Sequence, residues 1–146
     1  MGKTVETAVE IAAPPEAVWA VLADFGSYGD WNPLIRRVDG RPAVGERLDI
    51  QLSPGARNAR FPAEVLEAEA PRALVWRGRM AGGLVTGTHW MRLSPAGDGG
   101  VGTRLEHGET FSGPLALLLG RRLTDGARLG FQAMNRAVKA RAEGPG

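Results

Sequence analysis

Residues 103–138 read TRLEHGETFSGPLALLLGRRLTDGARLGFQAMNRAV, and the spacing of apolar residues changes within this stretch. Up to Phe111, apolar and polar residues alternate, which is typical of a half-buried β-strand. Beyond Pro114 the apolar residues recur every three or four positions, as on one face of an α-helix. These residues are Leu115, Leu119, Leu123, Ala127, Phe131, Met134 and Val138. Proline is well tolerated at the start of a helix, so we predict one continuous helix from Pro114 to about Glu143, long enough to lie along a whole sheet.

The two-residue alternation also occurs upstream of this helix. Residues 4–11 alternate as a first strand, and Pro14-Pro15-Glu16 predicts the start of a helix that glycines and Pro33 interrupt, so that a short second helical turn follows. Five or six further strands fit the alternating runs that follow, and turn residues such as Pro54-Gly55 separate several of these runs. The runs are residues 35–38, 47–52, 61–68, 72–79, 84–93 and 103–111. Because turns rather than helices lie between these runs, we expect an antiparallel sheet.

The length and composition are those of one ordinary globular domain, which we expect to cover residues 1–146. The chain has 146 residues, of which 43% are apolar and 23% are charged, and its 21 glycines and 10 prolines stay below the range of disordered chains. The sequence contains no cysteine. This excludes disulfide bonds, a thiolate nucleophile, cysteine-ligated zinc and iron–sulfur clusters.

The formal net charge is only +2, which does not by itself indicate a nucleic-acid partner. The cations gather in the C-terminal region, which carries two anions, Asp125 and Glu143. These cations are Arg121, Arg122, Arg128, Arg136, Lys139 and Arg141. They suit a solvated helix face, or a surface that binds an acidic partner protein or membrane.

No segment of the sequence predicts export or membrane insertion. The first ten residues lack the apolar core of an export signal. The most apolar stretch, residues 110–120, has 11 uncharged residues, whereas a membrane-spanning helix needs about 20. We therefore expect a cytoplasmic protein with no stable membrane insertion and no nucleic-acid partner.

Several motifs share the order and spacing of a known superfamily. They are PEAVWAVLADF at residues 15–25, YGDWNP at 28–33, PRALVW at 71–76, GTRL at 102–105, FSG at 111–113, GFQAMN at 130–135, and Lys139. Over nearly the whole chain the sequence resembles the START-like helix-grip superfamily, also called SRPBCC, and its polyketide cyclase/dehydrase-like members. The resemblance implies an α+β helix-grip fold, in which a curved antiparallel sheet of six or seven strands wraps around a long C-terminal helix, with two short helices after the first strand. It also implies a scaffold that carriers, cyclases and hydrolases share.

A bent sheet cannot press flush against one straight helix, so we expect an apolar hollow between them. Such a hollow would bind a small hydrophobic or amphipathic molecule, for example a lipid. The candidate wall residues are Trp31, Leu48, Ile50, Leu74, Trp76, Met91, Leu105, Phe111, Phe131 and Met134. The same side chains would equally suit a filled core.

The two histidines fall on strand faces that are otherwise apolar. If Leu93 pairs with Thr103, His89 faces His107, and Glu109 lies within reach of an imidazole. Three interpretations of His89, His107 and Glu109 remain open at this point. They are a hydrogen-bonded histidine pair in a cavity floor, a general base oriented by Glu109, and the ligands of a divalent metal.

These patterns predict a ligand-binding domain, either a monomer or a homodimer, with a small hydrophobic or amphipathic molecule as its partner and with no cofactor or metal. The alternative is an enzyme of the cyclase, dehydratase or hydrolase type. In that case His89 or His107 would move a proton while the cavity folds the substrate and excludes water. A third possibility is an interaction module that uses the basic helix face.

Overall fold

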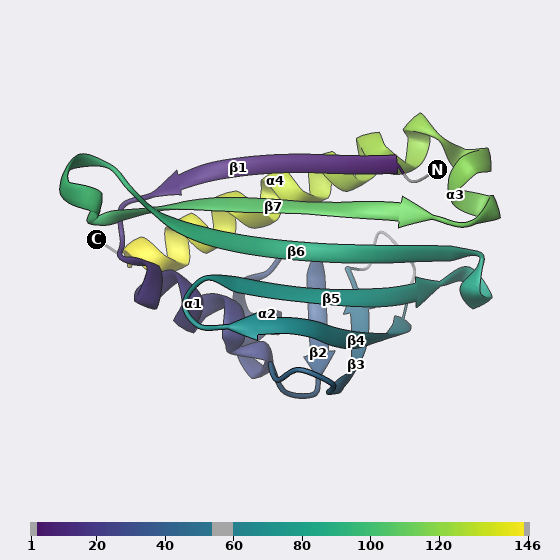
Figure 1. The fold of residues 1–146 in the computed structure, drawn as a ribbon, viewed down its shortest axis with the longest axis horizontal. Helices are drawn as coiled ribbons and strands as arrows, with labels where there is room; N and C mark the ends of the chain where they lie inside the picture. The colour runs from purple at the N-terminus through teal and green to yellow at the C-terminus, as the bar shows by residue number, and fades with distance from the viewer. Residues whose placement is uncertain (1–2, 54–59, 145–146) are drawn as a thin grey trace.

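The structure is a computed structural model that describes residues 3–53 and 60–144. Within these residues, seven antiparallel strands form one curved sheet in the order β1-β7-β6-β5-β4-β3-β2 (Figure 1). The strands are β1 Lys3–Ile11, β2 Ile35–Asp39, β3 Arg47–Leu52, β4 Arg60–Glu69, β5 Ala73–Met80, β6 Val85–Ala96 and β7 Gly102–Ser112. The helices are α1 Pro15–Ala23, α2 Tyr28–Trp31, α3 Pro114–Leu119 and α4 Arg121–Glu143, with a 3-10 turn, η1 Phe25–Ser27, before α2. The predicted α+β helix-grip fold is confirmed.

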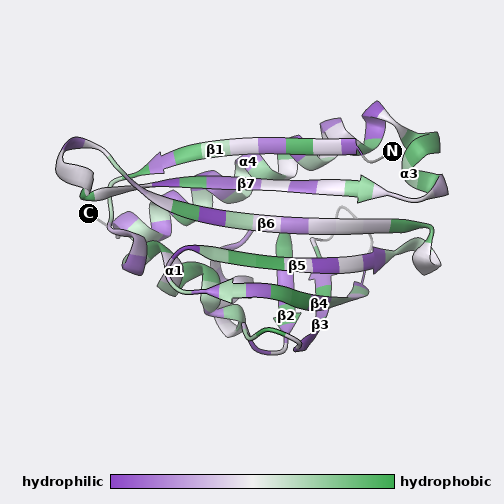
Figure 2. Ribbon diagram, viewed as in Figure 1, coloured by the Kyte–Doolittle hydropathy of each residue, from purple (hydrophilic) through white to green (hydrophobic). Residues whose placement is uncertain are grey.

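The alternation in the sequence sets which side of each strand is buried. Along β6, every second residue from Val85 to Leu93 is buried, including His89 and Met91, while the residues that alternate with them are more exposed. Figure 2 shows the same alternation of hydrophobic and hydrophilic residues along the strands. The predicted turn at Pro54-Gly55 lies outside the described residues.

Because β1 and β2 form opposite edges of the sheet, the segment between them must cross its whole width. Helices α1 and α2 make this crossing, and α1 packs against α4. The break between them is anchored by Tyr28, whose hydroxyl donates a hydrogen bond to the Leu22 carbonyl at 2.6 Å. The Phe25 ring packs edge-on against Tyr28 and Trp76. The predicted interruption and second helical turn are therefore confirmed.

The prediction of one continuous C-terminal helix is wrong, because the chain breaks at Gly120. This residue has a φ of +53°, and its N–H donates to the Ala116 carbonyl to close α3. Glycine adopts a positive φ without a steric penalty and has a low helix propensity, so it ends one helix and allows α4 to begin in a new direction. No described helix has the length and apolar character needed to cross a membrane.

Helix α4 is fixed along β1 by side chains that bind the backbone of that strand. Arg128 donates to the Glu6 carbonyl at 3.0 Å, and Lys139 donates to the Glu10 carbonyl at 3.2 Å. Glu143 accepts a hydrogen bond from the Ala12 N–H at 2.8 Å, just beyond the end of β1. Two of the six C-terminal cations thus have structural partners, so only part of the predicted basic face is available to another molecule.

The buried residues form two groups. The larger group lies between the sheet and helices α1 and α4, and it includes Leu74, Met91 and Val138. The smaller group, which includes Phe111 and Phe131, lies beside α3 and the first half of α4. The space between sheet and helix is incompletely filled where the two groups meet.

Candidate functional site

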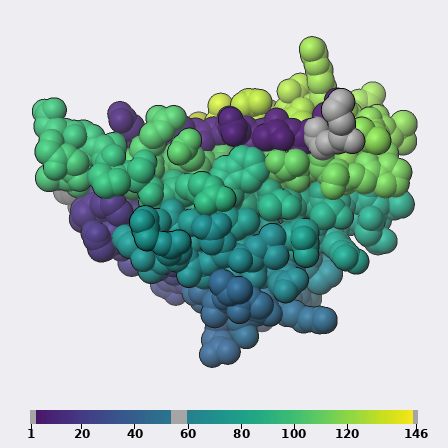
Figure 3. All heavy atoms as spheres, in the orientation of Figure 1, coloured from purple at the N-terminus to yellow at the C-terminus, as the bar shows by residue number. Residues whose placement is uncertain are grey.

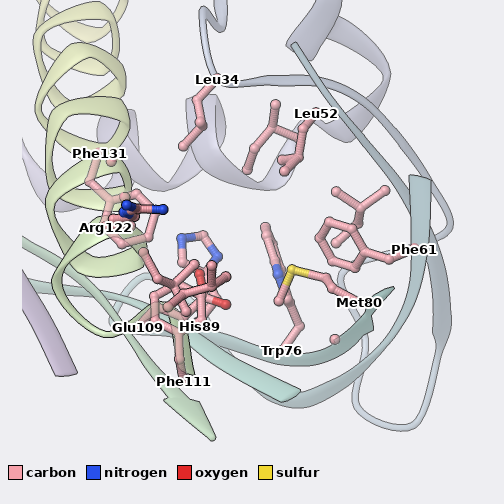
Figure 4. A pocket seen from close by; sticks show the side chains of 17 residues that line it. Leu34, Leu52, Phe61, Trp76, Met80, His89, Glu109, Phe111, Arg122 and Phe131 are labelled. Carbon is pink, nitrogen blue, oxygen red and sulfur yellow. The ribbon is translucent and has the colours of Figure 1, made fainter. Parts of the chain in front are cut away.

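A cavity of about 400 Å³ lies between the concave face of the sheet and the first half of α4, and it is partly open to solvent (Figure 4). Four of the predicted wall residues line it: Ile50, Trp76, Phe111 and Phe131. The other apolar lining residues were not among the predicted wall residues. These are Leu34, Ile35, Leu52, Phe61, Met80, Leu119, Leu123 and Ala127, with Gly78 and Gly126 between them.

The other six predicted wall residues do not line this cavity. Leu48, Leu74, Met91, Leu105 and Met134 are buried in the larger core group, at 3% exposure or less. Trp31 is half-buried and lines a separate surface depression beside Arg141. Alternation identifies the inward face of a strand, but it does not indicate where along the strand the helix leaves the sheet.

The pairing of Leu93 with Thr103, under which His89 would face His107, does not occur, because the observed register of β6 on β7 differs from it by two residues. Leu93 lies opposite Leu105, so His89 lies opposite Glu109 rather than opposite His107. The chain reverses within residues 97–101, where Gly97, Gly99 and Gly100 adopt positive φ angles that permit a tight turn. The two imidazoles nevertheless meet diagonally across the strands, and their Nε2 atoms are 2.6 Å apart.

A chain of hydrogen bonds fixes the proton positions on both rings. The Thr7 hydroxyl donates to the His107 carbonyl at 2.7 Å, so its oxygen accepts from Asn135 Nδ2 at 2.8 Å. Asn135 Oδ1 must then accept from the Nδ1–H of His107, at 2.7 Å. His107 Nε2 therefore carries the lone pair and accepts the Nε2–H of His89. This leaves His89 Nδ1 as an acceptor that has no hydrogen-bond donor among the described residues.

Burial keeps both histidines neutral. It lowers the pKa of His107 to about 4 and holds the pKa of His89 well below its usual value, with a further contribution from the neighbouring His107. The rings also stack near Phe131, whose centroid is 4.4 Å from that of His107. The arrangement in the structure is thus a pair of neutral, hydrogen-bonded imidazoles.

The metal interpretation does not fit this geometry. Two imidazole ligands of one zinc ion hold their nitrogens about 3.3 Å apart, because each Zn–N bond is about 2.0 Å and the site is tetrahedral. The Nε2 atoms of His89 and His107 are closer than this and bond to each other. In the part of the chain that the structure describes, no group of three or more His, Cys, Asp or Glu side chains could hold a metal ion.

Glu109 is the second polar group in the cavity. Its carboxylate lies over Gly87, where an added Cβ would be 1.9 Å from Oε2, so any larger residue at that position would force the carboxylate to move. No hydrogen bond joins Glu109 to either imidazole, and its carboxylate has no hydrogen-bond partner among the described residues. Burial raises the pKa of Glu109 to about 8, so the group is largely protonated at neutral pH.

Arg122 is the third polar group that lines the cavity. It lies in the first turn of α4, and Figure 4 shows its guanidinium on the helix side of the cavity, near Phe131 and above Glu109. The residue is exposed, which places its charge where the cavity meets solvent. The only sequence signal for Arg122 was its membership of the C-terminal cations.

Comparisons with known proteins agree with this architecture. Residues 3–143 match the family described as polyketide cyclase/dehydrase and lipid transport. No curated protein matches the sequence significantly. Among solved structures, a START superfamily protein from Mycobacterium smegmatis has a TM-score of 0.74 at 19% identity, and the match covers 96% of this chain and 97% of that one.

Two enzymes of known structure share the fold at similarly low sequence identity. Norcoclaurine synthase from Thalictrum flavum has a TM-score of 0.73 at 15% identity, with 97% of this chain and 94% of that chain covered. The di-domain aromatase/cyclase StfQ of the steffimycin pathway has a TM-score of 0.79 at 16% identity, with 98% of this chain and 52% of that chain covered. At these identities, the likeness shows a common fold only.

Proposed function

Because the chain belongs to the polyketide cyclase/dehydrase and lipid transport family, we propose that it binds a small hydrophobic or amphipathic molecule in the cavity between the sheet and α4. The observation that carries this proposal is the cavity lining. Every lining residue except His89, Glu109 and Arg122 is apolar or glycine. A volume of about 400 Å³ lies within the range of small-molecule sites.

The three polar groups suggest how such a ligand would be oriented. His89 Nδ1 can accept a hydrogen bond, and the protonated Glu109 carboxyl can donate one, so the inner end of the ligand would carry a hydroxyl or carbonyl group. Arg122 at the opening would favour an acidic group on the outer end. The ligand class that fits is therefore an apolar body with a neutral oxygen at one end and an anionic group at the other.

Gly126 offers a direct test, because it lines the cavity and an added Cβ would meet no atom within 4 Å. Gly126→Phe would place a ring in the opening, whereas Gly126→Ala would not. Titration with a fluorescent naphthalene sulfonate, which is apolar and anionic, should show at least a ten-fold weaker affinity for the phenylalanine variant and little change for the alanine variant. Equal affinities in all three proteins would refute binding in this cavity.

Native mass spectrometry of the protein purified from its own cells would complement this titration. A bound organic molecule that is present in the wild type and reduced in Gly126→Phe would identify the ligand class. A molecule retained equally by both proteins would place the binding site elsewhere.

A second function, acid/base catalysis on a carbonyl-containing ligand, is favoured by the state of the two polar groups in the cavity. His89 Nδ1 would remove a proton from the carbon next to the carbonyl, while Glu109 would give its proton to the carbonyl oxygen, forming an enol. A neutral carboxyl in an apolar site is suited to that donation. Such a step would serve a cyclase or dehydratase.

One experiment distinguishes the binding function from the catalytic function. Deuterium exchange at the carbon next to the carbonyl of a bound ketone, followed by NMR, should fall at least a hundred-fold in His89→Gln and Glu109→Gln if the protein is a catalyst. Affinity for the same ketone should change much less. Exchange that is no faster in the wild type than in these variants would leave only the binding function.

A further inference from the structure

The end of the molecule next to the cavity exposes leucines that no described element covers. Leu117 and Leu118 on α3 are 55% and 80% exposed, and Leu84, just before β6, is 50% exposed. The Leu115 N–H donates to the Leu84 carbonyl, which holds the two segments together. We refer to Leu84, Leu117 and Leu118 as the apolar tip. An exposed cluster of large apolar side chains marks a contact surface more often than an ordinary surface.

Cations surround the apolar tip. Arg121 and Arg122 begin α4, one residue after the end of α3, and both are exposed. Lys3 pairs with Phe111 at the adjoining end of the sheet, and Arg79 pairs with Thr86 beside Leu84. Figure 2 shows α3 as a hydrophobic segment beside the hydrophilic start of α4, and Figure 3 shows this yellow-green region at one end of the molecule. The neighbouring carboxyl groups are those of Asp125, a turn further along α4, Glu64, which lines a surface depression with Arg79, and Glu109, which lines the cavity with Arg122.

We propose that the apolar tip and the cations around it dock on the surface of an anionic lipid bilayer. Leucines that enter the boundary between headgroups and acyl chains, with arginines beside them at the phosphates, form the usual pattern of an interfacial contact. A stable protein interface, by contrast, needs roughly 800 Å² from each partner and about 20 to 30 residues, far more than three leucines supply. The contact would be peripheral, since no described helix can cross the membrane.

The docking surface adjoins the cavity opening. Leu119 ends α3 and lines the cavity, and Arg122 lines it one turn later. A bilayer held against the apolar tip would therefore lie beside the route by which an apolar ligand enters. This role in ligand exchange rests on the proposed binding function, whereas the docking itself does not.

Co-sedimentation with vesicles, without added ligand, tests the docking. The probe is vesicles of phosphatidylcholine with phosphatidylglycerol, compared with vesicles of phosphatidylcholine alone. We expect binding to the anionic vesicles only, and a decrease of about ten-fold in Leu117→Ser/Leu118→Ser. The control is Val101→Ser, because Val101 is 72% exposed and lies in the β6–β7 turn at the other end of the sheet.

A matched pair of charge variants tests the electrostatic part. Arg121→Gln should weaken vesicle binding about five-fold, because one cation near an anionic surface contributes about 1 kcal/mol. Arg136→Gln removes the same charge from an exposed position further along α4 and should change it little. The wild-type affinity should also fall steeply as the salt concentration rises.

Three results would overturn the proposal. The first is that the wild type does not bind anionic vesicles, and the second is that the wild type and Leu117→Ser/Leu118→Ser bind them equally. The third is that neither protein binds vesicles, while sedimentation velocity shows that the wild type self-associates and the double variant does not. The last result would assign the apolar tip to an interface between two copies. Titration of the double variant with the fluorescent naphthalene sulfonate keeps the two proposals apart, because neither leucine lines the cavity and probe affinity should persist.

Discussion

Replacing Glu109 with glutamine is expected to change how the stability of the protein depends on pH. Burial raises the pKa of Glu109 from 4.5 to about 8, so the folded protein retains a proton that the unfolded chain has lost. The folded state then binds more protons than the unfolded state, and stability falls as pH rises through this window. The slope is at most about 1.4 kcal/mol per pH unit.

The two histidines act in the opposite direction below pH 6.5. Their pKa values are lowered by burial, to about 4 for His107, so the unfolded chain binds protons that the folded state does not. Their contribution therefore rises with pH up to about 6.5 and is constant above it. Between about pH 6.5 and about pH 8 the opposing contribution of the histidines to the pH dependence fades, and the slope due to Glu109 over that interval gives a loss of at most about 2 kcal/mol.

Urea denaturation of the wild type and Glu109→Gln at closely spaced pH values measures this difference. Stability of the wild type should be greatest near pH 6.5 and should decline above it, whereas the variant should stay nearly level. Glu106→Gln is the matched control, because Glu106 lies on the exposed face of the same strand. Parallel curves for the wild type and Glu109→Gln between pH 6.5 and pH 8 would show that the Glu109 carboxyl is ionised in the folded protein, and the reasoning would fail.

Three further substitutions test other parts of the structure. Asn135→Leu should lower the free energy of unfolding by about 2–3 kcal/mol in urea denaturation, because it leaves the His107 Nδ1–H buried without an acceptor; a loss below about 0.5 kcal/mol would contradict the hydrogen-bond chain. Gly87→Ala should lower the free energy of unfolding by about 1–3 kcal/mol and move the Glu109 carboxyl. The stability of this variant should therefore depend less on pH above 6.5 than that of the wild type, and an unchanged pH profile would argue against the close contact. Gly126→Ala should raise thermal stability by about 1 kcal/mol, since its Cβ meets no neighbour and alanine favours a helix; a lower melting temperature would show that the helix is distorted there.

The sequence predicted the faces of the strands better than their register, for a physical reason. Side chains alternate with a period of two, so sliding β6 by two residues along β7 leaves every inward residue inward. His89 and His107 were therefore correctly placed on buried faces, whereas the sequence left open which residue lies opposite each of them. The register depends on the turn at residues 97–101, where several glycines allow more than one way of reversing the chain.

The helix break shows a similar limit. Leu115, Leu119 and Leu123 keep a spacing of four across Gly120, so the apolar pattern continues although the helix does not. Glycine was the only local sign of the break, and glycine within a helix is common enough to be ambiguous.

The hydrogen-bond chain behind the histidines could not be predicted from local pattern. Thr7 and Asn135 are 128 residues apart, and they meet because β1 pairs with β7 while α4 lies along β1. The cavity could not be predicted for the same reason, because the open space beside Gly126 becomes part of a cavity only where the sheet and α4 face each other. The polar residues could be picked out individually, but their partners required the assembled fold.

The placement of β1 also has a consequence for how the chain folds. Each of the strands β2 to β6 pairs with the next strand in sequence, so the meander from β2 to β7 can form from local contacts. Strand β1 must instead wait for β7, since Lys3 pairs with Phe111. Closing so long a loop carries an entropic cost that only the completed sheet and α4 can offset. We therefore expect the meander to form before β1 and α4 dock, so that the cavity closes last, in a step whose rate depends on the most distant contacts in the chain.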